Sequence, residues 1–152
     1  MNDKYNSLNH TAWECKYHVV FIPKCRRKAI YGELRKYLGQ CFRELASRKE
    51  SCVEEGHLQR DHVHMLLSIP PKHSVSDVIG FIKGKSAIAI ARNYMGKKNL
   101  RGESFWARGF LVSTVGARES VIREYIRKQE AEDKRLEQLS MFAKNETGFS
   151  RS

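Results

Sequence analysis

Residues 56–70, GHLQRDHVHMLLSIP, contain an alternation of apolar and polar side chains that begins at Asp61 and is typical of a half-buried β-strand. The two faces of this strand would differ in chemistry, with Val63, Met65, Leu67 and Ile69 on one and His62, His64, Leu66 and Ser68 on the other. Side chains two residues apart on a strand point the same way and lie about 6.5–7 Å apart at Cα. His62 and His64 can therefore both contact one ion or one phosphate, so this strand could supply two ligands of a metal site.

The same pair has a plainer explanation, in which His62 and His64 are exposed polar residues on a half-buried strand. His-x-His pairs also arise by chance. Two imidazoles leave most of a coordination shell empty, so a metal site would need a third protein ligand, remote in sequence, together with water or substrate oxygens. The metal hypothesis depends on finding that ligand.

Length and composition narrow the class of protein. At 152 residues the chain is long enough for one domain with a single core. Its 28 Lys and Arg against 17 Asp and Glu give a net charge of +11, which attracts polyanions, of which nucleic acid is the commonest. No apolar run approaches the ~20 residues of a membrane span, and the N-terminus lacks the apolar region of a signal peptide. We therefore expect a cytoplasmic protein without a membrane partner. The four cysteines, at 15, 25, 41 and 52, show no Cys-x-x-Cys spacing and are expected to be reduced thiols.

Periodicity along the chain predicts four strands and three helices. Strands are expected over 12–23, 51–59, 61–69 and 105–115, with Gly56 marking a bulge or turn, and helices over 29–49, 74–94 and 118–139. Ser74 can cap the second helix. A single domain over 11–140 would be flanked by a flexible N-terminus over 1–10 and a flexible tail over 141–152.

This order of elements predicts an α+β fold, an antiparallel sheet of ferredoxin-like or RRM-like β-α-β-β-α-β topology with an additional C-terminal helix. Two helices would cover one face of the sheet and leave the other open. If the helices cover the side of Val63 and Met65, then His62 and His64 lie on the open face. The last helix could lie across them, so it is the place to look for a third ligand.

The last helix contains a second pair of functional side chains. Tyr125 and Gln129 are four residues apart, which places them on one helix face with Cβ atoms about 6 Å apart. Taken singly, Tyr125 could be a packing residue and Gln129 a solvated helix former. Together with His62 and His64 they offer a nucleophile, a carboxamide ligand and two imidazoles, a set suited to attack on a metal-polarised phosphodiester.

Six blocks of sequence, in this order, resemble the single-tyrosine HUH transposases of the insertion-sequence 200/605 family. The blocks are 19–24 (VVFIPK) with 26–28 (RRK), 62–71 (HVHMLLSIPP), 80–86 (GFIKGKS), 105–110 (FWARGF), 113–116 (STVG) and 122–129 (IREYIRKQ). The resemblance covers nearly all of the chain. His-hydrophobe-His alone is a weak signal, but six blocks in order are a strong one.

The resemblance implies a homodimeric enzyme that binds hairpin ends of a mobile element in single-stranded DNA and cleaves and rejoins strands through a 5′-phosphotyrosine, without a nucleotide cofactor. It implies that His62, His64 and Gln129 bind Mg²⁺ or Mn²⁺, that Tyr125 is the nucleophile, and that the protein associates with the nucleoid through DNA. In the family, the tyrosine helix of one subunit completes the histidine site of the other. Gly116, which lacks a Cβ, would suit a hinge for that helix.

Several basic residues could hold the DNA, although each could also be a solvated surface charge. These candidates are Arg26, Arg27, Lys28, Lys83, Lys85 and Arg108. Two other functions fit part of the pattern. A non-catalytic nucleic-acid-binding module of RRM-like fold would explain the charge and the topology, and a metal-dependent hydrolase that uses a bound water would not need Tyr125.

Overall fold

The computed structural model describes residues 6–8, 11–24, 28–94, 105–116 and 119–147. Its strands are β1 (Asn6–Leu8), β2 (Thr11–Trp13), β3 (Lys16–Phe21), β4 (Cys52–Gln59), β5 (His62–Ser68) and β6 (Leu111–Val115). Its helices are α1 (Gly32–Arg48), α2 (Val75–Tyr94) and α3 (Glu119–Thr147). None of the helices in this described part is long and apolar enough to cross a membrane.

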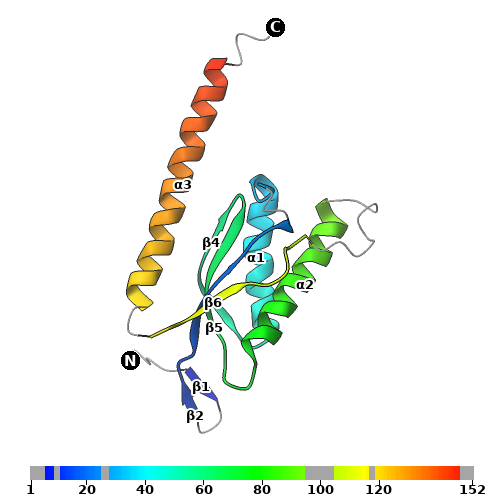
Figure 1. Ribbon diagram of the computed structural model, residues 1–152, viewed down its shortest axis with the longest axis vertical. Coiled ribbons are helices and arrows are strands. Elements are labelled where there is room, and N and C mark those ends of the chain that lie inside the picture. Colours follow the sequence, from blue (N-terminus) through cyan, green and yellow to red (C-terminus); the bar gives the residue numbers. More distant parts are fainter. Residues whose placement is uncertain (1–5, 9–10, 25–27, 95–104, 117–118, 148–152) are drawn as a thin grey trace.

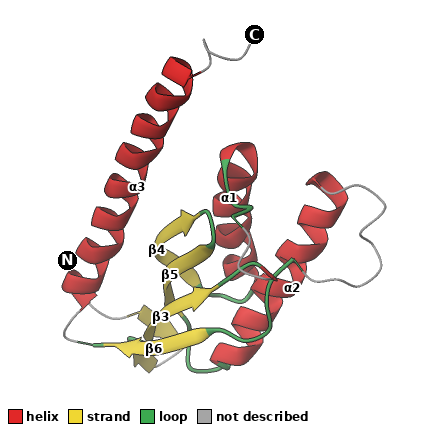
Figure 2. Ribbon diagram, turned by 45° about the horizontal axis from the view of Figure 1, so that its top comes forward, coloured by secondary structure: helices red, strands yellow, loops and turns green. Residues whose placement is uncertain are grey.

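The main sheet has four antiparallel strands in the order β4-β5-β3-β6. The helices α1 and α2 lie on one side of it and α3 on the other, as Figures 1 and 2 show from two directions. This arrangement confirms the predicted α+β fold with its additional C-terminal helix. β1 and β2 form a separate two-stranded sheet.

The hydrophobic core fills the space between the sheet and the helices α1 and α2. It contains every second side chain of β3 and β5 and the apolar stripes of the two helices, including Val19, Phe21, Val63, Met65, Leu67, Leu38, Phe42, Val78, Ile79 and Ile82. Trp106 packs edge-on against Phe21, with 4.7 Å between ring centroids. Its buried indole N–H donates to the hydroxyl of Ser86 at 2.9 Å, so the one polar group of this ring is satisfied.

Local features of the chain mark the first residues of α2 and α1. The hydroxyl of Ser74 accepts a hydrogen bond from the backbone N–H of Asp77 at 3.0 Å, which confirms the predicted cap of α2. α1 begins at Gly32, whose φ of 57° lies in the left-handed region that glycine tolerates best. The preceding Tyr31 is extended and makes no side-chain cap.

The strand predicted over 12–23 divides in two. β2 pairs with β1 and β3 joins the main sheet, so one alternating pattern serves two sheets. Pro23 lies beyond β3 in an isolated bridge with Trp106. The strand predicted over 105–115 is also shorter, because Phe105 and Trp106 are buried in the core before β6 begins, and Gly109 turns the chain with a φ of 79°.

Three boundaries differ from the sequence prediction. β1 forms within the segment expected to be flexible, because Asn6–Leu8 finds a partner strand in β2. The register shift of β4 falls between Val53 and Glu55 rather than at Gly56. α3 continues to Thr147, into the predicted tail, because the chain meets no glycine or proline before Gly148.

Candidate active site

The strand β5 presents His62 and His64 on the face of the sheet that α1 and α2 leave uncovered. Val63, between them, is fully buried on the opposite side. The strand register places His57 of β4 beside His64, and Gln59 of β4 beside His62. Since strand partners point to the same face, four polar side chains meet on the open side of the sheet.

Four imidazoles gather on this face, and we call them the histidine cluster: His18, His57, His62 and His64. The rings of His62 and His64 lie edge to face with centroids 4.6 Å apart. His18, on β3, stacks on His64 at 5.4 Å, and its Nε2 lies 3.2 Å from Nδ1 of His64. The two histidines predicted to act together therefore lie side by side, with further imidazoles around them.

Burial keeps most of the histidine cluster neutral. It lowers the pKa of His64 to about 4, and charge on the neighbouring imidazoles, His62 first, adds to the shift. Burial also lowers the pKa of His18 and of His57. The ring of His64 is therefore uncharged near neutral pH, so it has an unprotonated nitrogen that can act as a ligand.

Hydrogen bonds orient the two central rings. Nδ1 of His62 lies 2.7 Å from Oδ1 of Asp61, so this nitrogen donates to the carboxylate and Nε2 keeps its lone pair. If Nδ1–H of His64 donates to Nε2 of His18, then Nε2 of His64 also carries no hydrogen and keeps its lone pair. Metal-binding histidines are commonly oriented by such a bond from the second ring nitrogen.

An apolar patch fixes α3 to this face. It consists of Leu66 on β5, Val115 on β6 and Ile126 on α3, all buried, with Ile122 packed against them. Ile122 and Ile126 are one helical turn apart, and the next positions on the same side are Gln129 and Asp133. The side of α3 that faces the sheet is therefore apolar at its start and polar further on.

Hydrogen bonds and ion pairs surround the apolar patch, and we call them the polar seam. The seam joins Lys16 to Glu119, Arg123 to Glu54 and Glu55, Arg127 to Glu55, Gln59 to Gln129 and His57 to Asp133. The imidazole of His57 is 2% exposed, and its Nε2 lies 2.8 Å from Oδ2 of Asp133. α3 is thus held on the sheet mainly by polar contacts to β4.

The structure brings Gln129 into contact with Gln59, beside His62, but keeps Tyr125 outside the histidine cluster. Nε2 of Gln59 donates to Oε1 of Gln129 at 2.9 Å, and Gln59 is the strand partner of His62. Tyr125 lies one helical turn before Gln129 and is 51% exposed. Within the part of the chain that is described, no hydrogen bond or ring contact joins Tyr125 to the histidine cluster.

The donor set fits a divalent ion. His62 and His64 offer Nε2 atoms whose partner nitrogens are already engaged, and Oε1 of Gln129 accepts one hydrogen bond and has a second lone pair. Among the described residues, no three His, Cys, Asp or Glu side chains are arranged to hold a metal. The amide oxygen of Gln129 is the candidate for a third protein ligand.

The basic residues predicted to hold DNA differ in their surroundings. The Lys83 ammonium donates to the carbonyl oxygens of Ala107 and Gly109 at 2.8 and 2.7 Å, and burial lowers its pKa. Lys83 therefore anchors the loop before β6. Lys28, Lys85 and Arg108 are exposed. Arg26 and Arg27 lie outside the described residues.

The side chains that support this site were not predicted from the sequence. They are His18, His57, Gln59, Asp61 and Asp133, each of which contacts a predicted site residue or the helix that carries one. Two signals were present in the sequence: His57 and Gln59 alternate on β4, and Asp133 follows Gln129 by four residues. Neither signal could be used without the register of β4 on β5 and the docking of α3.

A family model described as "Transposase IS200 like" matches residues 11–129, which include every residue of the candidate site except Asp133. The chain belongs to the IS200-like transposase family. This finding confirms the resemblance drawn from the six sequence blocks. It also establishes this transposase, in general terms, as an enzyme that cleaves DNA and transfers strands.

Individual relatives agree with this assignment. The IS200-like transposase is 47% identical over 136 residues to the transposase for insertion sequence element IS200 of Salmonella typhimurium, covering 89% of this chain and 90% of that one. It is 29% identical over 119 residues to the ISDra2 transposase TnpA of Deinococcus radiodurans, covering 77% and 85%.

Solved structures share the fold. A crystal structure of a protein assigned as a transposase from Deinococcus radiodurans matches with a TM-score of 0.66 and 24% identity, covering 82% of this chain and 98% of that one. A REP-associated tyrosine transposase bound to a REP hairpin matches with a TM-score of 0.56 and 10% identity, covering 80% and 68%. At these identities the likeness supports the fold alone.

Proposed function

We propose that this transposase binds hairpin ends of its element in single-stranded DNA, and cleaves and rejoins strands through a 5′-phosphotyrosine on Tyr125. The observation that carries the proposal is the docking of α3. This helix brings Gln129 to Gln59, the strand partner of His62, and carries Tyr125 one turn away. Membership of the family supports strand transfer, and the hairpin bound by the structural relative supports a hairpin substrate.

Tyr125 is the nucleophile in the proposed reaction. Its phenol oxygen attacks the scissile phosphorus, forms a P–O bond and displaces the 3′ oxygen, which leaves as a hydroxyl while the phenol loses its proton. One phosphodiester replaces another, so little bond energy is lost. A 3′-hydroxyl from a different end can attack the phosphotyrosine in turn and restore the tyrosine. No nucleotide cofactor is required for this exchange.

We propose that His62, His64 and Gln129 hold Mg²⁺ or Mn²⁺ beside this reaction. When bound, such an ion neutralises phosphate charge and makes the phosphorus more open to attack. Asp61 and His18 would keep the two imidazoles in the orientation that presents Nε2. Gln59 would keep the amide oxygen of Gln129 toward the histidine strand.

We further propose that the active form is a homodimer in which α3 of one subunit docks on the histidine face of the other. The polar seam supports this proposal, because it is formed by side chains that a second copy could engage in the same way. Mixing His64→Ala and Tyr125→Phe variants tests it. Cleavage restored by mixing would support docking between subunits, and two inactive variants that stay inactive together would contradict it.

Covalent capture tests the proposed function. Single-stranded DNA from the ends of the element that carries this gene is labelled at its 3′ or its 5′ end, incubated with protein and Mg²⁺ or Mn²⁺, and run on a denaturing protein gel. The 3′ label should stay on the protein and the 5′ label should not, because the tyrosine retains the 5′ phosphate.

Tyr125→Phe should lose the covalent band and cleavage, whereas Tyr37→Phe should keep both. Tyr37 is a suitable control because it lies on α1, which covers the opposite face of the sheet from the histidine cluster, and its hydroxyl accepts a hydrogen bond from Asn93 of α2. Cleavage by Tyr125→Phe would indicate a water-using hydrolase. Binding without cleavage by the unmodified protein would indicate a non-catalytic module.

A further inference from the structure

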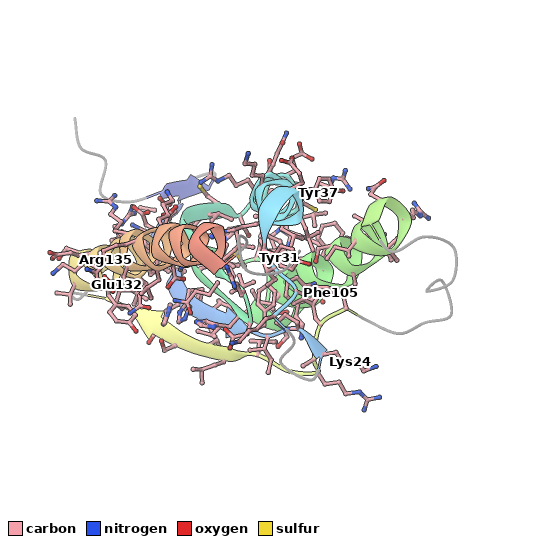
Figure 3. The ribbon with its side chains drawn as sticks, turned by 90° about the horizontal axis from the view of Figure 1, so that it is seen from above. Lys24, Tyr31, Tyr37, Phe105, Glu132 and Arg135 are labelled. Atoms are coloured by element: carbon pink, nitrogen blue, oxygen red, sulfur yellow. The ribbon has the colours of Figure 1, made fainter. Side chains whose placement is uncertain are left out.

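A groove crosses the outer edge of β4 between α1 and α3. Its volume is about 670 Å³, within the range of pockets that hold small ligands. β4 is an edge strand that pairs only with β5, so α1 on one face and α3 on the other form the two walls. Figure 1 shows β4 between α3 and α1, and Figure 3 looks down on this region with Tyr31, which precedes α1, labelled.

The groove has an apolar floor and a basic rim. The floor is formed by buried and half-buried side chains: Phe42, Val53, Leu58 and Met65. The rim carries four cationic side chains, Arg35, Lys36, Arg43 and Lys134, against one carboxylate, that of Glu130. An apolar base and a charged phosphate are the two chemical parts of a nucleotide, and this groove offers a surface for each.

Two glycines keep the groove open. Gly39 lies in the middle of α1, where glycine costs about 1 kcal/mol relative to alanine, and Gly56 lies in β4, where it also weakens the strand. Neither has a positive φ. A Cβ built at either position meets its neighbours at ordinary contact distances, with the nearest atoms at 3.8 and 3.5 Å. The fold therefore does not require glycine at these positions, and a side chain there would enter the groove.

The groove begins beside the histidine cluster. His57 lines it, and His57 is both the strand partner of His64 and the hydrogen-bond partner of Asp133 on α3. Glu130 and Lys134, which line the groove from α3, follow Gln129 within two turns. His57 therefore belongs to both the histidine cluster and the groove, so the two regions are adjacent.

We propose that this groove binds the single-stranded DNA that flanks the hairpin, with a base on the apolar floor and phosphates on Lys36, Arg43 and Lys134. The proposal rests on the proposed function, because that function supplies a single-stranded substrate. It adds a second contact region outside the histidine face. Tyr31, 61% exposed and next to Gly32 in the groove wall, is placed to stack on a further base.

Filling the groove tests the proposal. Gly39→Leu places a larger side chain in the groove and favours helix, whereas Gly80→Leu makes the same change at an exposed position of α2 where a Cβ meets nothing within 4 Å. Fluorescence anisotropy in EDTA, which excludes metal-dependent cleavage, is measured with the element-end hairpin carrying its single-stranded flank and with the hairpin alone.

Gly39→Leu should weaken binding of the flanked hairpin about tenfold, because the leucine would displace one base from the apolar floor. It should leave the isolated hairpin unchanged and should not lower the melting temperature, and Gly80→Leu should bind both DNAs normally. Unchanged binding of the flanked hairpin by Gly39→Leu, or an equal loss on both DNAs, would overturn the proposal.

A charge reversal gives a second test that does not depend on packing. Lys134→Glu and Lys128→Glu are matched, because both lysines are exposed on α3 and pair with a glutamate four residues earlier. Only Lys134 lines the groove. Lys134→Glu should reduce the salt dependence of binding by about one phosphate contact and Lys128→Glu should not. Equal effects of the two variants would contradict the assignment of Lys134 to the groove.

Covalent capture at Tyr125 is a separate measurement, so failure of the groove proposal and failure of the proposed catalytic mechanism give different results.

Discussion

The two faces of the central sheet are covered in different ways. On one face, α1 and α2 bury a continuous apolar core that includes Val63, Met65 and Leu67. On the other, α3 buries three apolar residues, Leu66, Val115 and Ile126, within the polar seam. The first face has the composition of a permanent core, and the second has that of an interface that can open.

This difference explains where the chemistry lies. A neutral imidazole or an amide can be kept half-buried under a helix only if its polar atoms have partners, and the polar seam supplies them. Gln129 and Tyr125 lie on this helix, whose contacts with the sheet are mainly polar. If the proposed function is correct, the face that maintains the fold is separate from the face that performs the reaction.

The largest expected contrast is between Leu67→Ala and Leu66→Ala. The two leucines are neighbours on β5 and both are fully buried, but Leu67 faces the core and Leu66 faces α3. We expect Leu67→Ala to lower the free energy of unfolding by about 4 kcal/mol and Leu66→Ala by about 2 kcal/mol, since α3 can settle into the space. Urea denaturation measures both, and equal losses would contradict the comparison.

A smaller effect is expected at Asp61. Asp61→Asn weakens the acceptor that orients His62 without removing a proposed ligand, so Mn²⁺ affinity should fall about 10- to 100-fold. His62→Ala and His64→Ala should lose more affinity still. Isothermal titration with Mn²⁺ gives these values, and binding that is unchanged in both histidine variants would refute the metal assignment.

The polar seam should contribute about 1 kcal/mol through Arg123, which bonds Glu54 and Glu55 on β4. Arg123→Ala should speed amide hydrogen exchange in α3 while leaving α1 and α2 unchanged, and the effect should shrink at high salt. Arg135→Ala is the control, because Arg135 pairs with Glu132 of the same helix and, among the described residues, makes no ion pair with the sheet (Figure 3). Similar acceleration by both variants would mean that the seam does not hold the helix.

Acid should weaken the histidine face by a modest amount. The pKa of His64 is about 4 in the folded protein against an ordinary value of 6.5, so protons bind the unfolded chain more tightly. The contribution of His64 to the free energy of unfolding is fully present above pH 6.5 and is lost as the pH falls toward 4. Urea denaturation at pH 7 and pH 5 should show this loss, and His64→Gln should reduce it. A variant with the same pH dependence as the unmodified protein would exclude His64 as its source.

The sequence was sufficient for elements whose pattern is local. The alternation from Asp61 to Ile69 and the stripe of α2 from Val75 to Ile90 predicted both their type and their buried face. The open-face position of His62 and His64 followed from the same alternation. These predictions succeeded because period-two and period-3.6 patterns report directly which side is buried.

The sequence was insufficient where distant elements meet. The pairing of His57 with Asp133 depends on the register of β4 and on the angle of α3, and neither leaves a local pattern. The alternation over 12–23 could not show that it serves two sheets, because a period of two fits a strand of either sheet. Lys83 was predicted to hold DNA, and nothing in the sequence indicated that its ammonium donates to backbone carbonyl oxygens, because carbonyl groups are the same in every sequence.

The most direct test of the central claim is to locate the covalent bond. The protein is reacted with element-end DNA and Mg²⁺, digested with nuclease and trypsin, and examined by mass spectrometry. The peptide 124–127 should carry a nucleotide joined through its 5′ phosphate to Tyr125. Cleaved DNA with an unmodified 124–127 peptide, or an adduct on another residue, would contradict the account.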